Sequence, residues 1–169
     1  MVIGCCGAGK STLTRKLKSI LKLPVIHLDQ YYWKPNWVET PKDEWCKTVQ
    51  SLAEQPKWII DGNYGGTMEI RLEKADTVIF LDYPTWRCML RVIKRIIKYK
   101  GKVRPDMVEG CRERFDIDFL HYVLVFNLTR RKSILQKIRK FEDGFNLVVL
   151  KNDSEVKQFL NSKSNLERS

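Results

Sequence analysis

Residues 4–12 combine glycines, a lysine and a hydroxyl group at the spacing G-x-x-x-x-G-K-[ST], which is the pattern of a phosphate-binding loop, or P-loop. Gly4, Gly7 and Gly9 permit turns that a Cβ atom would obstruct, so successive backbone N–H groups can point into one concavity. We expect these amides, including those of Ala8 and Thr12, to hold the phosphates of a nucleotide.

Lys10 and Ser11 supply the functional side chains of this loop. A helix that begins at Lys10 adds the positive end of its dipole. The Lys10 ammonium can then reach the β- and γ-phosphates, and the Ser11 hydroxyl can ligate Mg²⁺. A glycine-rich turn without a ligand is the alternative. The residues after the loop argue against it, because four of them have the spacing of a helix's core face: Leu13, Leu17, Ile20 and Leu21.

The elements that position this loop follow from the hydrophobic pattern. Apolar runs typical of strands end near residues 3, 29, 61, 82 and 150, with helical patterns between them. This alternation predicts an α/β fold, a parallel sheet with helices on both faces. Right-handed crossovers place the carboxyl ends of all its strands at one edge, where the phosphate-binding loop also lies.

Three of these strands end in a carboxylate: Asp29, Asp61 and Asp82. Phosphoryl transfer needs Mg²⁺, cations on the migrating phosphoryl group and an oriented acceptor. We expect one acid to belong to the Mg²⁺ shell, Asp61 or Asp82, and one to hold or deprotonate the acceptor. Capping of the following helix is the alternative for each acid, and we favour it for Asp82.

Three segments carry further expectations. The helix after Pro84 is expected to turn an apolar stripe toward the core: Trp86, Leu90, Ile93 and Ile97. Residues 99–115 are rich in Lys and Arg and too long for an ordinary connection, which favours a lid over a solvated loop. In residues 30–37, Tyr31, Tyr32, Trp33 and Trp37 either pack over the core or stack on an acceptor, and both interpretations stay open. Helical patterns follow at about 116–141, with a possible break near Asn127, and at 154–160.

Length and composition limit the class of protein. The chain has 169 residues, a net charge of +11, five cysteines and two histidines. No apolar run approaches the length of a membrane span and no signal peptide is evident, so we expect a cytoplasmic protein with reduced thiols. Without a C-x-x-C pair, zinc is not expected. Whether residues precede Met1 and whether Cys5 and Cys6 have a redox role stay open.

The chain resembles the adenylate-kinase-like branch of the P-loop kinases, and within it the small bacterial group labelled adenylate kinase or DNA topology modulation protein. The resemblance covers residues 1–160 as one domain. It rests on the loop, His27-Leu28-Asp29, residues 32–37, Trp58-Ile59-Ile60-Asp61-Gly62-Asn63-Tyr64, Leu81-Asp82-Tyr83-Pro84, Arg104-Pro105-Asp106-Met107, residues 109–111 and residues 115–120. Residues 161–169 are expected to be a polar, frayed tail.

This resemblance implies a three-layer sandwich whose parallel strands run in the order 2-3-1-4-5, with an acceptor site after the second strand and a small mobile lid at about 99–115. It implies that Asp61 with Gly62 lies near the Mg²⁺ shell and that Arg71 contacts an acceptor phosphate. It further implies lid arginines at Arg104, Arg112 and Arg114, and a place near the adenine for Lys151. Asn63-Tyr64-Gly65 replaces the Phe-Pro-Arg of adenylate kinases, so AMP is in doubt as the acceptor.

Two functions follow as hypotheses. The first is a phosphotransferase that uses Mg²⁺ and ATP on a small acceptor, plausibly a nucleoside or nucleotide. The second is a nucleic-acid-associated ATPase or regulator, in which residues 87–98 and 130–140 would contact phosphate backbones through their cations. The second is not favoured, since no nucleic-acid recognition motif is present. The sequence does not predict the oligomeric state.

Overall fold

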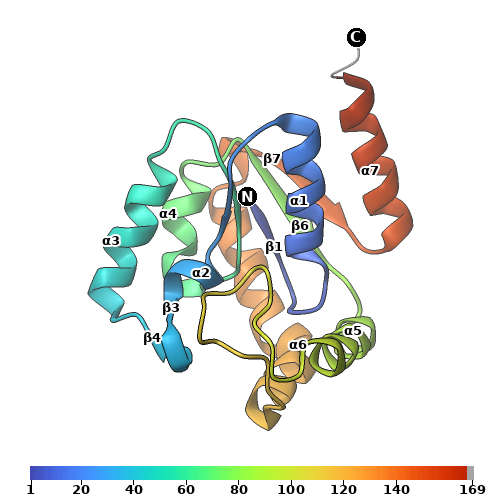
Figure 1. Cartoon of the computed structure of the whole chain (residues 1–169). Coiled ribbons are helices and arrows are strands. Elements are labelled where there is room, and N and C mark those ends of the chain that lie inside the picture. Colours follow the sequence, from blue (N-terminus) through green and yellow to red (C-terminus); the bar gives the residue numbers. More distant parts are fainter. Residues whose placement is uncertain (167–169) are drawn as a thin grey trace.

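The computed structural model describes residues 1–166 and has an α/β architecture built on a five-stranded parallel sheet (Figure 1). The strands are β1 (Val2–Gly4), β2 (Val25–His27), β5 (Ile59–Asp61), β6 (Thr77–Leu81) and β7 (Asn146–Leu150). They run in the order β2-β5-β1-β6-β7. The glycine-rich loop therefore leaves the middle strand, and the carboxyl ends of its neighbours surround it.

Helices cover both faces of the sheet. They are α1 (Lys10–Leu21), α3 (Lys42–Ala53), α4 (Met68–Leu72), α5 (Thr85–Tyr99), α6 (Ile117–Lys140) and α7 (Asp153–Leu166). The first and last contact each other, as α4 and α6 do, and Figure 1 shows these two pairs on opposite sides of the sheet. In α1, Leu13 and Leu17 are buried, and Ile20 and Leu21 pack against the same core. The predicted face of this helix is confirmed.

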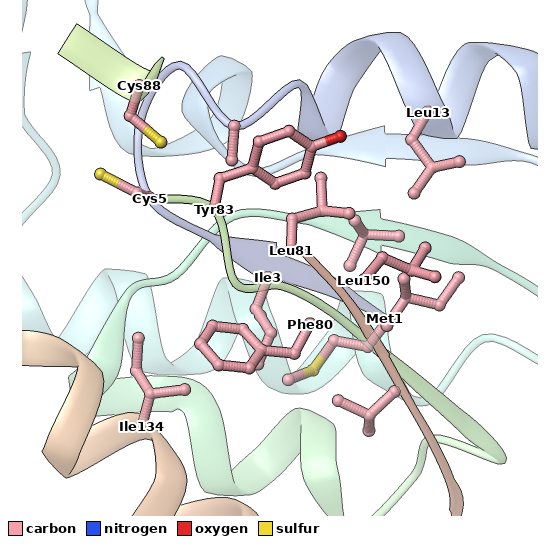
Figure 2. Close-up of a cluster of buried hydrophobic side chains, with 14 of the residues drawn as sticks. Met1, Ile3, Cys5, Leu13, Phe80, Leu81, Tyr83, Cys88, Ile134 and Leu150 are labelled. Atoms are coloured by element: carbon pink, nitrogen blue, oxygen red, sulfur yellow. The ribbon is translucent and has the colours of Figure 1, made fainter. Parts of the chain in front are cut away.

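Apolar side chains from both faces form two clusters. The larger joins β1 and β6 to α1, α5 and α6, and the smaller lies between α3 and the strands β2 and β5. Figure 2 shows part of the larger cluster, where the side chains of Cys5 and Cys88 are neighbours. All five cysteines lie in the described part of the chain and are free thiols.

Several boundaries differ from the prediction. Asp29 does not end β2 but begins a one-turn helix, α2 (Asp29–Tyr32). The aromatic segment continues into a small antiparallel pair, β3 (Trp33–Lys34) and β4 (Val38–Glu39). The α6 helix is continuous through Asn127. The predicted polar tail from residue 161 is helical up to Leu166, because α7 continues, and residues 167–169 lie outside the described part.

The predicted inward face of α5 is wrong. Its residues Trp86, Leu90, Ile93 and Ile97 are 61%, 51%, 41% and 72% exposed. The buried face holds Cys88, Val92 and Ile96, which are also spaced one turn apart. The small side chains of Cys88 and Val92 let the helix approach the glycine-rich loop, since a Cβ atom on Gly7 would lie 2.3 Å from the Cys88 carbonyl oxygen. This close contact with the loop, rather than the larger apolar area of the other stripe, selects the face that is buried.

Candidate functional site

The loop between β1 and α1 has a backbone that only glycine adopts easily. Gly4, Gly7 and Gly9 have φ angles of 146°, 84° and 98°, in the region that L residues avoid. A Cβ atom on Gly4 would also lie 2.5 Å from the carbonyl oxygen of Leu81. The loop is therefore closely fitted between β6 and α5, and residues 7–12, including Ala8 and Thr12, line a cavity of about 1620 Å³.

Lys10 and Ser11 both face this cavity. The Lys10 ammonium donates to the carbonyl oxygens of Gly4 and Cys5 at 3.0 and 3.2 Å, which folds the side chain back over the loop. The Ser11 hydroxyl donates to a carboxylate oxygen of Asp106 at 3.1 Å. The positive end of α1 and the Lys10 ammonium therefore lie at the same side of the cavity.

Asp61 lies at the cavity end of β5 and is buried. Its Oδ2 accepts a hydrogen bond from Thr14 at 3.0 Å and lies 2.8 Å from Nδ1 of His27. The pairing follows from the sheet, since His27 of β2 lies opposite Asp61 in the β2–β5 register. The hydrogen bond to Asp61 raises the pKa of His27 above its ordinary value, although burial opposes this.

Asp29 also lines the cavity, whereas Asp82 does not. The hydroxyl of Tyr64 donates to Oδ1 of Asp29 at 2.6 Å. Burial first, and then the Asp29 carboxylate, raises the pKa of Tyr64, so its hydroxyl remains a donor. Asp82 instead binds the guanidinium of Arg131 through both carboxylate oxygens, at 2.7 and 2.8 Å. Asp82 therefore neither lines the cavity nor caps a helix, because both of its carboxylate oxygens are bound by Arg131 of α6.

Arg71 does not reach the cavity, so the expected contact with an acceptor phosphate is wrong for this structure. The side chain is fully buried. Its guanidinium donates to the carbonyl oxygens of Gly62, Asn63 and Tyr64 at 2.8, 2.5 and 3.2 Å. Burial lowers the pKa of Arg71 to about 9, which leaves it charged at neutral pH. Arg71 therefore fixes the turn after β5 rather than binding a ligand.

That turn joins the two ends of the cavity. The side-chain amide of Asn63 donates to the carbonyl oxygen of Gly4 at 2.9 Å and accepts from the Gly4 amide at 3.0 Å. Tyr64, the next residue, holds Asp29 and has a left-handed backbone with φ of 37°. The motif 58–64 indicated that this turn mattered, but only the structure shows the contacts of Asn63 and Tyr64.

The expected lid residues differ in position. Arg104 and Arg114 line the main cavity, but Arg112 does not and its side chain is exposed. Arg104 pairs with Asp106 and Glu113, and Arg114 lies 3.6 Å from Asp116. Each cation is thus already beside an acid of the α5–α6 loop (residues 100–116).

The sequence pattern did not indicate Arg91 and Arg95 of α5 as site residues. Both line the cavity, where Arg91 pairs with Asp153 and Arg95 pairs with Glu113.

Lys151 lies outside the main cavity. Its backbone amide donates to Glu155 at the start of α7. The expected place of Lys151 near a nucleotide base is therefore not reproduced. From α7, the cavity receives the charged residues Asp153 and Lys157 instead.

The aromatic segment divides between the two interpretations. Tyr32, Trp45 and Tyr64 form a contiguous group with ring centroids 4.7 to 5.1 Å apart, against the smaller apolar cluster. Trp33 and Trp37 pack edge to face at 5.4 Å, and both line the cavity. Tyr31 is exposed. Core packing therefore accounts for part of the group, while Trp33 and Trp37 offer indole surface to the cavity.

The donors around Ser11 suit a hard cation. A serine hydroxyl and carboxylates are oxygen ligands, which Mg²⁺ prefers. Among residues 1–166, no group of three or more His, Cys, Asp or Glu side chains is arranged to hold a metal by itself. A Mg²⁺ ion at Ser11 would thus take further ligands from phosphate and water, as is common for nucleotide sites.

In the described part, no helix combines the length and apolar content needed to cross a bilayer. Comparison with protein-family models and with curated proteins finds no significant match to this chain.

Proposed function

We propose that the protein is a P-loop phosphotransferase that uses Mg²⁺ and ATP to phosphorylate a small acceptor of the nucleoside class. One observation carries this proposal: the glycine-rich loop, Asp61 and Asp29 line a single cavity. Its volume exceeds the roughly 300–1,000 Å³ of a single small-molecule pocket, so two ligands can lie end to end. The strand order β2-β5-β1-β6-β7 supports a P-loop sandwich, because the resemblance implies the same order.

At the donor end, the amides of residues 7–12 and the dipole of α1 would bind the polyphosphate. The Lys10 ammonium would leave the Gly4 and Cys5 carbonyls for the β- and γ-phosphates. Ser11 would ligate the Mg²⁺ directly, and Asp61 would belong to the shell around the ion. When bound, Mg²⁺ neutralises phosphate charge. The α5–α6 loop would act as a lid, with Arg104 and Arg114 at its cavity side.

At the acceptor end, Asp29 would orient an acceptor hydroxyl and take its proton, while Tyr64 holds the carboxylate in place. Trp33 and Trp37 would contact a planar or sugar face of the acceptor. Because Arg71 is bound to three carbonyl oxygens, it cannot serve an acceptor phosphate without unfolding the turn. This favours a hydroxyl acceptor such as a nucleoside over a nucleoside monophosphate.

The alternative, a nucleic-acid-associated ATPase, receives less support. Several cations of the proposed contact surface already pair with acids: Arg91, Arg95, Arg131, Lys137 and Lys140. Such pairs would have to break before these residues could neutralise a phosphate backbone. Steep salt-dependent binding to DNA or RNA, measured by mobility shift at several ionic strengths, would restore this alternative.

Phosphoryl transfer from [γ-³²P]ATP to a panel of nucleosides, their monophosphates and other metabolic alcohols tests the proposal. We expect one acceptor class to be labelled in the presence of Mg²⁺, and Asp29→Asn to reduce the rate by roughly 10²–10⁴-fold. Asp82→Asn is the matched control, because Asp82 lies outside the cavity. Absence of transfer to every acceptor, with full Mg²⁺·ATP binding, would contradict the kinase function.

A further inference from the structure

The Ser11 hydroxyl has one acid partner in the structure, and it comes from the α5–α6 loop. Ser11 Oγ donates to Oδ2 of Asp106, 95 residues away, at 3.1 Å. Neither strand-end acid occupies this place. Asp61 Oδ2 is bound by Thr14 and His27, and Asp82 is bound by Arg131.

Asp106 is held in position from both sides. Within its own loop, Arg104 donates to Asp106 at 3.3 Å, and Arg104 in turn lies 2.7 Å from a carboxylate oxygen of Glu113. That Arg104–Glu113 contact is an ion pair without hydrogen-bond geometry. From the other side, Gln30 donates to the carbonyl oxygen of Pro105, the residue before Asp106, at 3.3 Å. The carboxylate is thus set against Ser11 by contacts that do not involve the glycine-rich loop.

A hydroxyl that ligates a cation uses an oxygen lone pair and keeps its O–H for a hydrogen bond. A carboxylate that accepts this bond increases the electron density on the ligating oxygen and orients it. Partners of metal ligands that act in this way typically contribute 10–100-fold to metal affinity. The Ser11–Asp106 contact is compatible with Mg²⁺ at Ser11, because the O–H points to the acid and the lone pairs point away from it.

We propose that Asp106 completes the metal site: it accepts the Ser11 hydrogen bond while Ser11 ligates Mg²⁺, so metal binding and closure of the α5–α6 loop stabilise each other. This rests on the proposed nucleotide function, whose donor end contains Ser11. Asp106 is a positioning residue here, since it acts on the cation through Ser11.

The test compares the affinity for a fluorescent N-methylanthraniloyl-ADP in excess Mg²⁺ and in EDTA. The dissociation constant in EDTA divided by that in Mg²⁺ measures how strongly metal and nucleotide binding are coupled. We expect Asp106→Asn to lower this ratio at least tenfold, and Asp106→Glu to recover part of it. Glu109→Gln is the control, because it removes the same charge from an exposed position of the same loop.

Each other outcome is decisive. A higher ratio in Asp106→Asn would show that Asp106 competes with the metal for Ser11, and an unchanged ratio would show a contact without a metal role. Either overturns the inference. If the wild-type protein binds nucleotide equally well with and without Mg²⁺, the inference also fails while nucleotide binding stands. If it binds no nucleotide at all, the proposed function fails and the inference fails with it. Thermal midpoints of the variants establish that each is folded.

Discussion

The hydroxyl of Tyr64 donates a 2.6 Å hydrogen bond to the Asp29 carboxylate, although Tyr64 has a left-handed backbone that a tyrosine seldom adopts. The buried guanidinium of Arg71 bonds to the carbonyl oxygen of Tyr64 and to the two carbonyls before it. A strained conformation persists when its surroundings over-determine it, and such residues cluster at functional sites. The Arg71 contacts therefore hold the tyrosine that orients the proposed acceptor base.

Tyr64→Phe removes this hydrogen bond and leaves the ring in place. A hydrogen bond to a charged group contributes about 1.5–3 kcal/mol, so we expect the rate of phosphoryl transfer to fall roughly 10–100-fold. Steady-state kinetics on the labelled acceptor measure this. Tyr31→Phe, at an exposed ring, should behave as wild type. An unchanged rate in Tyr64→Phe would mean that Asp29 is not held by this contact during the reaction.

Arg71→Met should destabilise the fold. The substitution leaves the carbonyl oxygens of Gly62 and Asn63 without their donor, at about 1–3 kcal/mol for each buried acceptor. The carbonyl of Tyr64 still accepts from the Thr67 amide, so we expect the free energy of unfolding to fall by at least ~2 kcal/mol. Urea denaturation measures the change, with the exposed Arg112→Met as the matched control. A stable Arg71→Met protein that loses only acceptor affinity would instead restore Arg71 as a ligand of an acceptor phosphate.

Gly7→Ala tests the fit of the glycine-rich loop. The new methyl group would lie 2.3 Å from the Cys88 carbonyl oxygen, and the φ of 84° at this position is strained for alanine. The loop or α5 must therefore move. We expect nucleotide affinity to fall at least tenfold and the thermal midpoint to drop. At Gly144, a Cβ atom meets nothing within 4 Å, and Gly144→Ala should change neither property. Wild-type affinity in Gly7→Ala would show that the loop backbone is not the phosphate cradle.

His27 should make stability depend on pH near neutrality. Its folded-state pKa is raised above the ordinary 6.5 by the hydrogen bond to Asp61. The protonated form is therefore favoured in the folded protein, and this stabilisation is complete below pH 6.5 and lost as the pH rises through the raised pKa. Burial lowers the pKa of the Met1 amino group to about 5, which gives the wild type and its variants the same opposite trend. We therefore expect the difference in free energy of unfolding between the wild type and His27→Gln, measured in EDTA, to decrease over that interval. The difference between the wild type and His121→Gln, at an exposed position, should stay constant.

The parts of the fold that were predictable are those that local pattern determines. The alternation of apolar runs predicted a parallel sheet, and the glycine spacing placed the loop and the start of α1 at Lys10. The face of α5 was not predictable, because two apolar stripes coexist on it. The stripe that is buried contains Cys88 and Val92, whose small size matters only against Gly7.

The site was predictable where backbone geometry carries it and unpredictable where long-range pairing decides. Asp61 at the end of β5, and Asp29 two residues after β2, reach the cavity because the carboxyl ends of parallel strands share one edge. Asp82 ends a strand in the same way, yet α6 places Arg131 against it, and nothing near Asp82 in the sequence indicates this partner. Asp106 reached Ser11 through a loop without periodicity, so no pattern could have paired them.

Isothermal titration calorimetry of ATP in the presence of Mg²⁺ tests phosphate binding by residues 4–12 most directly. The wild-type protein should bind with one-to-one stoichiometry, and Lys10→Ala should weaken binding by roughly tenfold or more, since a hydrogen bond to a charged group contributes about 1.5–3 kcal/mol. Lys18→Ala, at an exposed position of the same helix outside the cavity lining, is the matched control and should retain most of the affinity. If the folded wild-type protein takes up no purine triphosphate in the presence of Mg²⁺, the phosphate site and every function proposed from it are contradicted.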